Sequence, residues 1–291
     1  IMDINYELYK VFYHVAATLS FSEASKQLFI SQSAVSQSIK VLEKKLNQTL
    51  FIRSTKKVQL TPEGEILLKH VEPAINLIQG ENQLLEANTL NGGQLRIGAS
   101  DTICRYYLIP YLNRFHKAYP NVHIKVTNQT SIECAHLLEN GQVDFIITNY
   151  PNSGLSNSQN VRVINEFHDV FVANQEYFPL KGEAVSLQKL QTYPILMLDR
   201  KSTTSEFLHH MFQREQLDLV PEIELSSNDL LIDLARIGLG IAFVPDFCIP
   251  ENDKDLFIVR LTEKMPARQM IVAYNESLPV SQASKQFMDM M

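Results

Sequence analysis

Apolar residues recur with a helical period through the first part of the chain. Residues 6–18 predict a first helix, whose apolar face consists of Leu8, Val11, Phe12 and Val15. A second, shorter helix is expected to begin with Ser22 as its N-cap, with Ala24 and Leu28 directed inward. A turn through Phe29 and Ile30 follows. Two short helices meeting at such a turn are typical of a helix-turn-helix.

A third helix follows this turn, and Ser31 is its expected N-cap because the hydroxyl can accept an otherwise unpaired backbone N–H. Its inward positions are Ala34, Val35, Ile39, Leu42 and Leu46. The opposite face carries short or flexible hydrogen-bonding side chains: Gln32, Ser33, Ser36, Gln37 and Lys40. Such side chains can contact base edges and phosphates in a major groove. A solvated helix face would have the same composition, so this helix alone leaves both interpretations open.

The next segment favours contact with DNA. Residues 51–53 and 58–60 are predicted to be two short strands, joined by Ser54, Thr55, Lys56 and Lys57. A wing would place Arg53, Lys56 and Lys57 against backbone phosphates, whereas an ordinary hairpin would merely expose them. Residues 1–60 contain eight Lys and Arg against four Asp and Glu, a net charge of +4 in a chain of net charge −6. A basic head on an acidic body indicates that one end meets a polyanion.

Length and composition set limits on the class of protein. The chain has 291 residues, with 45% hydrophobic and 20% charged residues, which is typical of a globular protein of about two domains. It contains no apolar run long enough for a membrane span and no signal peptide is expected. The cysteines Cys104, Cys134 and Cys248 are odd in number and scattered, which favours a reduced, cytoplasmic protein. No cofactor is predicted, and the adjacent pair His209-His210 does not suit a shared metal.

A long helix is predicted after the hairpin, with Thr61 as its N-cap and Pro62 at its first position. Its apolar residues are spaced as in a coiled coil, at Leu67, Val71, Ala74, Ile78 and Leu85. This stripe favours dimerisation through a partner helix, although packing on its own domain would give the same pattern. The sequence Asn91-Gly92-Gly93 then breaks the helix and is interpreted as a hinge.

Strands and helices alternate from residue 94 onward, which predicts a parallel sheet with helices on both faces. The predicted strands are 95–100, 122–128, 145–148, 171–173, 195–198, 223–226 and 269–274. The predicted helices are 103–118, 131–140, 204–214 and 229–237, with a final amphipathic helix at the end. Residues 150–160 are rich in Pro, Asn, Ser and Gly and are predicted to be a loop, and Gly238–Pro245 is a turn into a buried strand.

These residues together resemble a LysR-type transcriptional regulator along essentially the whole chain. The resemblance is carried by Ala24, Leu28, Ser31-Gln32, Ala34-Val35-Ser36, Ile39, Leu42-Glu43, Leu50-Phe51, Arg53 and Leu60–Gly64, and further by Ile97–Ser100, Gly141–Asp144 and Gly238–Pro245. One departure is Ser33, where many members have Pro. The resemblance implies an α+β multidomain protein with an N-terminal winged helix-turn-helix, a long linker helix and a C-terminal α/β periplasmic-binding-protein-like effector domain of two subdomains.

The expected domains are 1–61 for DNA binding, 62–90 for the dimerising linker and 91–291 for the effector domain. Subdomain I is expected at about 94–160 and 267–291, and subdomain II at about 161–266. The implied protein is a sequence-specific regulator, not an enzyme, whose operator binding or DNA bending responds to a small-molecule effector. Its expected partners are a dyad-symmetric operator, the effector, further copies of itself in a dimer or tetramer, and RNA polymerase as a further candidate.

A cleft between two α/β halves should bind its ligand where strand ends meet helix N-termini. Those positions are rich in hydroxyl groups, which suits a small anion or carboxylate. Thr130 is a candidate effector contact because it stands at the start of the helix predicted from residue 131. The resemblance implies effector contacts at Ser100, Thr102, Thr148, Ser202 and Thr203. Ordinary caps and turns would use the same residues. Nearby candidates for a charge partner of the ligand are Arg105, Arg200 and Lys201.

Two other classes of function remain as alternatives. One is a small-molecule binding protein without DNA selectivity, and the other is an enzyme. The sequence contains no recognisable catalytic or metal-ligand spacing, which counts against the enzyme.

Overall fold

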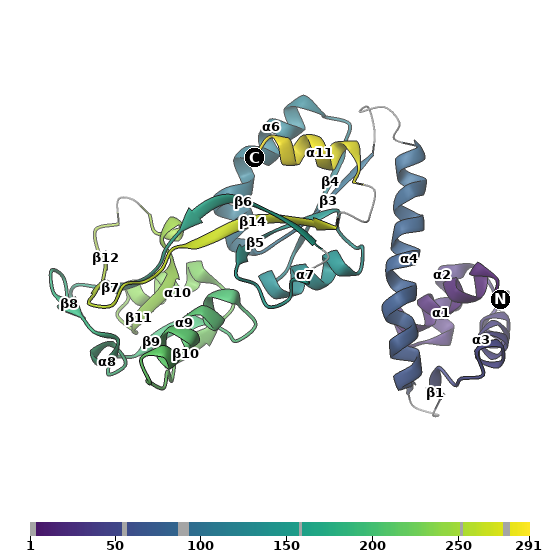
Figure 1. Ribbon diagram of the computed structural model, residues 1–291, viewed down its shortest axis with the longest axis horizontal. Coiled ribbons are helices and arrows are strands. Elements are labelled where there is room, and N and C mark those ends of the chain that lie inside the picture. Colours follow the sequence, from purple (N-terminus) through teal and green to yellow (C-terminus); the bar gives the residue numbers. More distant parts are fainter. Residues whose placement is uncertain (1–3, 54–56, 87–92, 157–158, 251–252, 276–279) are drawn as a thin grey trace. The chain divides into compact units, whose positions relative to one another are not determined.

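The computed structural model describes the chain except residues 1–3, 54–56, 87–92, 157–158, 251–252 and 276–279, and the side chains of residues 80–86. The chain forms two compact units. The N-terminal unit holds helices α1 to α4 and the β1–β2 hairpin, and the C-terminal unit holds the later elements (Figure 1). Within the described residues, no helix is both long and apolar enough to cross a membrane.

The N-terminal unit is built from the three helices, hairpin and long helix that the sequence predicts. Its elements are α1 (Tyr6–Thr18), α2 (Phe21–Leu28), α3 (Gln32–Leu46), β1 (Phe51–Arg53), β2 (Val58–Leu60) and α4 (Pro62–Glu86). Apolar side chains from all four helices and β1 form one core, in which Phe12, Val15, Val35, Ile39 and Leu42 are fully buried. The period of the apolar positions therefore predicts where the helices form and which face of each helix is buried.

Serine hydroxyl groups fix where α2 and α3 begin. The prediction of Ser22 as the cap of α2 is wrong, because Ser20 accepts the N–H of Glu23 and the helix begins at Phe21. Both serines suit a cap, but Ser20 has the extended backbone that a cap requires. The prediction for α3 is confirmed, since Ser31 Oγ accepts the N–H of Ala34 at 3.1 Å.

Two close contacts join the hairpin to the helices around it. The carboxylate of Glu43 in α3 accepts the N–H groups of Leu50 and Phe51, which leads the chain into β1. Thr61 caps α4 by accepting the N–H of Gly64. A Cβ atom at Gly64 would lie 2.3 Å from the carbonyl oxygen of Leu50, so only glycine fits there. The Thr-Pro-Glu-Gly segment is thus a packing motif between α4 and the strand.

The apolar stripe of α4 packs partly on its own unit, which the sequence left as the alternative to a partner helix. Leu67 and Val71 contact the core of the N-terminal unit together with Ile75, and of these Leu67 is only half-buried. Ile66 and Ile78 remain exposed, at 61% and 40%. The predicted residue Leu85 and the predicted hinge at residues 91–92 lie outside the residues whose side chains are described.

The C-terminal unit contains two five-stranded sheets, and the first has the order β4-β3-β5-β14-β6. Its strands are β3 (Gln94–Ala99), β4 (His123–Asn128), β5 (Phe145–Tyr150), β6 (Gln159–Phe167) and β14 (Arg268–Asn275). Strand β3 runs parallel to β4 and β5, whereas β14 is antiparallel to β5 and β6. The sheet is therefore mixed rather than parallel.

Helices pack on both faces of the first sheet, as Figure 1 shows. They are α5 (Asp101–Ile103), a π-helical turn η1 (Cys104–Leu108), α6 (Ile109–Ala118), α7 (Ser131–Glu139) and α11 (Gln282–Asp289). The helix predicted for residues 103–118 thus begins at Asp101 and contains a π turn. Asp144, just before β5, accepts bonds from the backbone and guanidinium of Arg96 and from Ser284, which ties β3 and α11 together.

The second sheet has the order β10-β9-β11-β7-β12 and is also mixed, because β7 is antiparallel to both neighbours. Its strands are β7 (Asp169–Asn174), β9 (Ile195–Leu198), β10 (Ile223–Leu225), β11 (Ile241–Pro245) and β12 (Leu256–Ile258). The remaining elements are β8 (Ala184–Val185), α8 (Leu187–Leu190), α9 (Thr203–Arg214), α10 (Asn228–Arg236), η2 (Asp246–Cys248) and β13 (Arg260–Leu261).

The chain crosses between the two sheets twice, between β6 and β7 and again between β13 and β14. Strand β6 pairs with β14 along its whole length, so the first sheet extends to Phe167 instead of ending near residue 160. The loop predicted for residues 150–160 also ends earlier, since β6 begins at Gln159. These two passages of the chain join the halves of the C-terminal unit.

Candidate functional site

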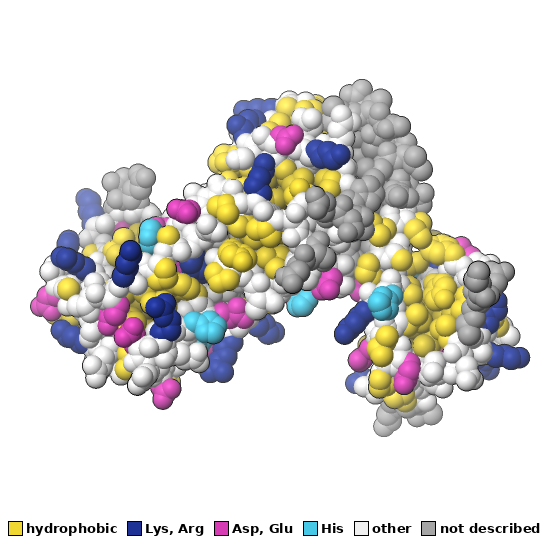
Figure 2. All heavy atoms as spheres, in the orientation of Figure 1, with side chains coloured by type: hydrophobic (Ala, Val, Ile, Leu, Met, Phe, Trp, Pro, Cys, Tyr) yellow, Lys and Arg dark blue, Asp and Glu magenta, His cyan; other side chains and the backbone are white. Residues whose placement is uncertain are grey.

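The polar face of α3 is the candidate DNA-binding surface of the N-terminal unit. Gln32, Ser33, Gln37 and Lys40 are exposed, and Ser36 is half-buried. The opposite face of the helix is anchored by Val35, Ile39 and Leu42, which have no exposed surface. The predicted residues of this helix therefore share one solvent-facing side of a rigidly packed element. Figure 2 shows dark blue basic side chains and yellow apolar ones on the visible surface of this unit.

Ser33 and Arg53, which are predicted DNA contacts, also have partners inside the unit. The hydroxyl groups of Ser33 and the cap Ser31 lie 2.9 Å apart. The guanidinium of Arg53 lies 3.6 Å from the Glu43 carboxylate and 4.4 Å from the centre of the Phe21 ring. Arg53 therefore also packs the hairpin against α2 and α3. Lys57 is exposed next to β2, and Lys56 lies outside the described residues.

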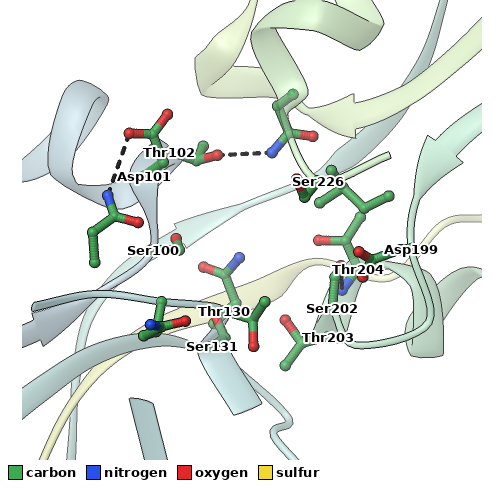
Figure 3. Close-up of a pocket in the computed structure, with 15 residues that line it drawn as sticks. Ser100, Asp101, Thr102, Thr130, Ser131, Asp199, Ser202, Thr203, Thr204 and Ser226 are labelled. Carbon is green, nitrogen blue, oxygen red and sulfur yellow. Dashed lines mark hydrogen bonds between the residues drawn. The ribbon is translucent and has the colours of Figure 1, made fainter. Parts of the chain in front are cut away.

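A pocket of about 240 Å3 lies in the C-terminal unit, at the ends of strands from both sheets. Figure 3 shows hydroxyl-bearing side chains converging on it from several elements. All of its lining residues except Leu198 have polar side chains, and they are Ser100, Asp101, Thr102, Asn128, Gln129, Thr130, Ser131, Asn149, Leu198, Asp199, Ser202, Thr203, Thr204, Ser226 and Asn228. Five of the six predicted effector contacts are among these residues.

Several of the lining hydroxyl groups act as helix caps. Ser100 accepts the N–H of Ile103, and Thr130 accepts the N–H of Glu133 at the start of α7. Ser202 accepts the N–H groups of Thr204 and Ser205 and so begins α9. The helix N-termini therefore point at the pocket because their caps form its wall.

Thr148 does not line the pocket, contrary to the prediction. Its side chain is fully buried, and its hydroxyl accepts a hydrogen bond from Asn152 Nδ2 at 2.8 Å. Strand β5 continues to Tyr150, and successive side chains on a strand point to opposite faces. The residue of this strand that lines the pocket is therefore the next one, Asn149.

Side chains of the two halves are bonded to each other beside the pocket. Asn228 at the start of α10 donates to the Thr102 hydroxyl at 2.9 Å. The hydroxyl of Tyr106 and the guanidinium of Arg105 both contact Asp229. These contacts hold the walls of the pocket together from opposite sheets.

A buried ion pair lies directly behind the pocket wall. Arg268, at the start of β14, donates to Asp169 at the start of β7 at 2.7 Å and to Thr204 at 3.1 Å. The two side chains of the ion pair are 1% and 0% exposed. The guanidinium also lies over the rings of Phe167 and Phe207. Thr204 lines the pocket, so the wall is connected through Arg268 to β14 of the first sheet and to β7 of the second.

Charge in the pocket differs from the expectation of a basic partner for an anion. Among the described residues that line it are the carboxylates of Asp101 and Asp199 but no Lys, Arg or His. Arg105 is paired with Asp229, and Arg200 and Lys201 are exposed residues outside the lining. Positive potential in the pocket therefore comes from helix N-termini rather than from basic side chains.

Several other lining residues were not predicted from the sequence, although they also stand where strands end. Asn128 and Gln129 end or follow β4, Asp199 follows β9 and Ser226 follows β10. All stand at strand ends facing the pocket, so applying the strand-end rule to every polar side chain at these ends would have found them.

The cysteines are poorly suited to redox sensing. Burial raises the pKa of the Cys104 thiol to about 11 and that of the Cys134 thiol to about 12. Burial also raises the pKa of Cys248. Because the thiolate is the reactive species, these groups are protonated and slow to react near neutral pH.

Comparison with known proteins identifies the family. The sequence matches the LysR substrate binding domain over residues 88–291 and the bacterial regulatory helix-turn-helix protein, lysR family, over residues 6–65. It is 30% identical over 243 residues to a probable RuBisCO transcriptional regulator of Synechocystis sp. strain PCC 6803, covering 82% of this chain and 70% of that protein.

Solved structures show the same fold. Full-length CbnR in complex with its target DNA aligns with a TM-score of 0.67 at 16% identity, covering 98% of both chains. The CcmR regulatory domain of Synechocystis PCC6803 in complex with 2-PG aligns with a TM-score of 0.62 at 22% identity, covering 68% of this chain and 94% of that one. The helix-turn-helix and the two-sheet pocket are thus parts of one architecture: the chain belongs to the LysR family of DNA-binding transcriptional regulators with an effector-binding domain.

Proposed function

We propose that α3 reads the operator in a major groove through Gln32, Ser36 and Gln37, while Lys40 and Lys57 contact phosphates. The observation that carries this proposal is the exposed polar face of a helix whose other face is fully buried in the core. Gln can pair with an adenine edge, and lysines supply affinity that does not depend on sequence. Ser33 and Arg53 contribute less direct readout, because each already contacts a neighbouring side chain.

The protein acts on a dyad-symmetric site as a dimer or a larger assembly, in the cytoplasm where its DNA lies. Ile66 and Ile78 on α4 support self-association, since large apolar residues left exposed on a helix are suited to a partner. CbnR, which shares the fold, has been solved on its target DNA. The proposed domains are residues 1–61 for DNA binding, 62–90 for the linker and the remainder for effector binding.

A small polar effector in the pocket modulates operator binding or DNA bending. The pocket supports this proposal because its wall contains groups from both sheets, so a ligand there contacts both halves at once. A ligand that prefers one arrangement of the halves shifts the population toward it. The CcmR regulatory domain, with the same fold, is a complex with the small molecule 2-PG.

The test is binding of the full chain to the intergenic DNA upstream of its own gene, against random DNA of equal length, across a salt series. We expect selective, salt-dependent binding with protection of a dyad site. Equal affinity for both DNAs at every salt concentration would contradict sequence readout at that site. Ligand binding with no DNA binding at low salt would instead support a small-molecule binding protein.

A further inference from the structure

The side chains that line the effector pocket are poorly suited to a ligand that carries only negative charge. Its described lining includes two carboxylates, Asp101 and Asp199, and no basic side chain. Figure 3 shows them at different sides of the pocket. Asp101 is exposed and accepts a bond from Asn128 at 3.3 Å, whereas Asp199 is half-buried. A ligand that carried only negative charge would face this half-buried carboxylate without a basic side chain to offset it.

Two amide oxygens in the lining strengthen this point. Oδ1 of Asn149 and Oδ1 of Asn228 are buried and have no hydrogen-bond partner within the described part of the chain. The two residues are only 6% and 4% exposed. An unpaired buried acceptor is costly, so a rotation of either side chain that brings its oxygen to a ligand N–H group would be favourable. This part of the lining therefore favours a ligand that donates hydrogen bonds over one that only accepts them.

Three helices begin at the pocket, and their N-termini favour a negatively charged group on the ligand. Helices α7, α9 and α10 start at Ser131, Thr203 and Asn228, all of which line it. Each first turn has about four N–H groups without an intrahelical acceptor, and the side-chain caps accept one in α7, two in α9 and one in α10. The remaining N–H groups and the helix dipoles favour an acid group.

We infer that the effector is a zwitterion, a small 2-amino acid. This inference rests on the proposed function of the pocket and names the ligand class for it. The carboxylate of the ligand lies at the helix N-termini, and its ammonium group pairs with Asp199. An ammonium has three donors and no acceptor, so Asp199 can accept one of them and the hydroxyl and amide oxygens of the lining can accept the others.

The rest of the lining limits the side chain of this amino acid. Leu198 is the one apolar residue among the described lining residues, and the others carry hydroxyl, amide or carboxylate groups. With a volume of about 240 Å3, the pocket suits a small or polar side chain rather than a large aliphatic one.

The test is binding of the common amino acids, each at millimolar concentration, to the full chain. Thermal stabilisation identifies a binder, and calorimetry then gives its Kd. Two analogues of the same skeleton are measured beside it, the 2-hydroxy acid and the decarboxylated amine. We expect each analogue to bind on the order of 10- to 100-fold more weakly, since each loses one charged hydrogen-bonding end.

Asp199→Asn and Asp101→Asn form a matched pair of variants. Both remove one lining carboxylate and keep its shape, and the amide oxygen of the Asp199→Asn variant can still accept the N–H of Lys201, which Asp199 Oδ1 accepts at 3.0 Å. We expect Asp199→Asn to lose the preference for the amino acid over its hydroxy acid, and Asp101→Asn to keep it. Circular dichroism melting shows that each variant is folded, and Asp199→Glu, which restores the charge, should recover part of the preference.

Binding of the hydroxy acid as tightly as the amino acid, or of no amino acid, would overturn the inference. So would an unchanged preference in Asp199→Asn. Binding to the upstream DNA is measured on the same preparations. Selective DNA binding without amino-acid binding leaves the regulator intact and removes only the ligand class, whereas loss of selective DNA binding counts against the proposed function itself.

Discussion

The α3 surface and the effector pocket use polar residues in opposite ways. On α3 the polar residues stand exposed, and the helix is held by a separate apolar face. In the pocket the polar residues range from exposed to buried, and many already cap helices or bond across the two halves. The first region separates recognition from stability, whereas the second combines them. Substitutions should therefore affect only function on α3 but both function and folding at the pocket.

The largest effect is expected at the ion pair behind the pocket. Arg268→Met leaves Asp169 buried without its charge partner, which should lower the free energy of unfolding of the C-terminal unit by about 3–5 kcal/mol. Denaturant unfolding followed by circular dichroism measures it. Adding Asp169→Leu removes the stranded charge and should restore much of the loss. An unchanged unfolding midpoint in Arg268→Met would show that the pair does not stabilise the unit.

The next largest effect is expected for a substitution in the packing of the N-terminal unit, away from the polar surface of α3. Gly64→Ala places a Cβ atom 2.3 Å from the Leu50 carbonyl oxygen, a backbone atom that cannot move aside easily. The cost should be about 3 kcal/mol, as for strong overpacking. Hydrogen exchange should rise in α2 and α3 and DNA binding should weaken, while ligand binding stays unchanged. Glu65→Ala, at the exposed neighbour, is the control and should show neither change.

Gln32→Ala is the sharpest test of the exposed surface. It should reduce discrimination between operator and random DNA by about 1–3 kcal/mol and leave the melting temperature unchanged. Competition binding at fixed salt measures the discrimination, with Gln79→Ala on α4 as the control. If both DNAs lost affinity equally, Gln32 would not read bases. If the melting temperature fell, the separation of recognition from stability would be wrong.

The smallest effect tests the double role of pocket residues. Ser202→Ala removes the cap of α9 and should cost about 1 kcal/mol of stability together with a loss of ligand affinity. Ser186→Ala is a matched control, because Ser186 caps α8 through a similar bond but does not line the pocket. The two variants should lose similar stability, and only the first should bind ligand more weakly.

The sequence predicted the N-terminal unit closely because its determinants are local. Strands β1 and β2 have the predicted bounds, and α1 spans the predicted residues. The cap of α2 was misplaced by two residues, since Ser20 and Ser22 differ in backbone conformation rather than in residue type. The spacing of the apolar residues on α4 could not show what they pack against. The same spacing is expected whether a helix packs on its own core or on a helix of another copy.

Errors in the C-terminal unit arose where structure depends on distant residues. Strand β6 is an edge strand with little alternation of apolar residues, and it is held by β14, more than a hundred residues later. The antiparallel direction of β14 has the same distant origin. Thr148 was misassigned because a shift of one residue along a strand reverses the side on which a side chain lies. The abundance of hydroxyl groups in the pocket was still predictable, because many of them belong to helix caps, which depend on local sequence.

The position of β14 in the first sheet has a consequence for synthesis of the protein. The second sheet uses strands from one continuous segment, β7 to β12, whereas the first sheet has a gap between β5 and β6 until β14 emerges. The second half can therefore form on the ribosome while the first still carries two unpaired strand edges, which are prone to associate with other chains. Translation must reach residues 268–275 before these edges are covered, so the interval between synthesis of β6 and β14 is when the nascent chain most needs protection from aggregation.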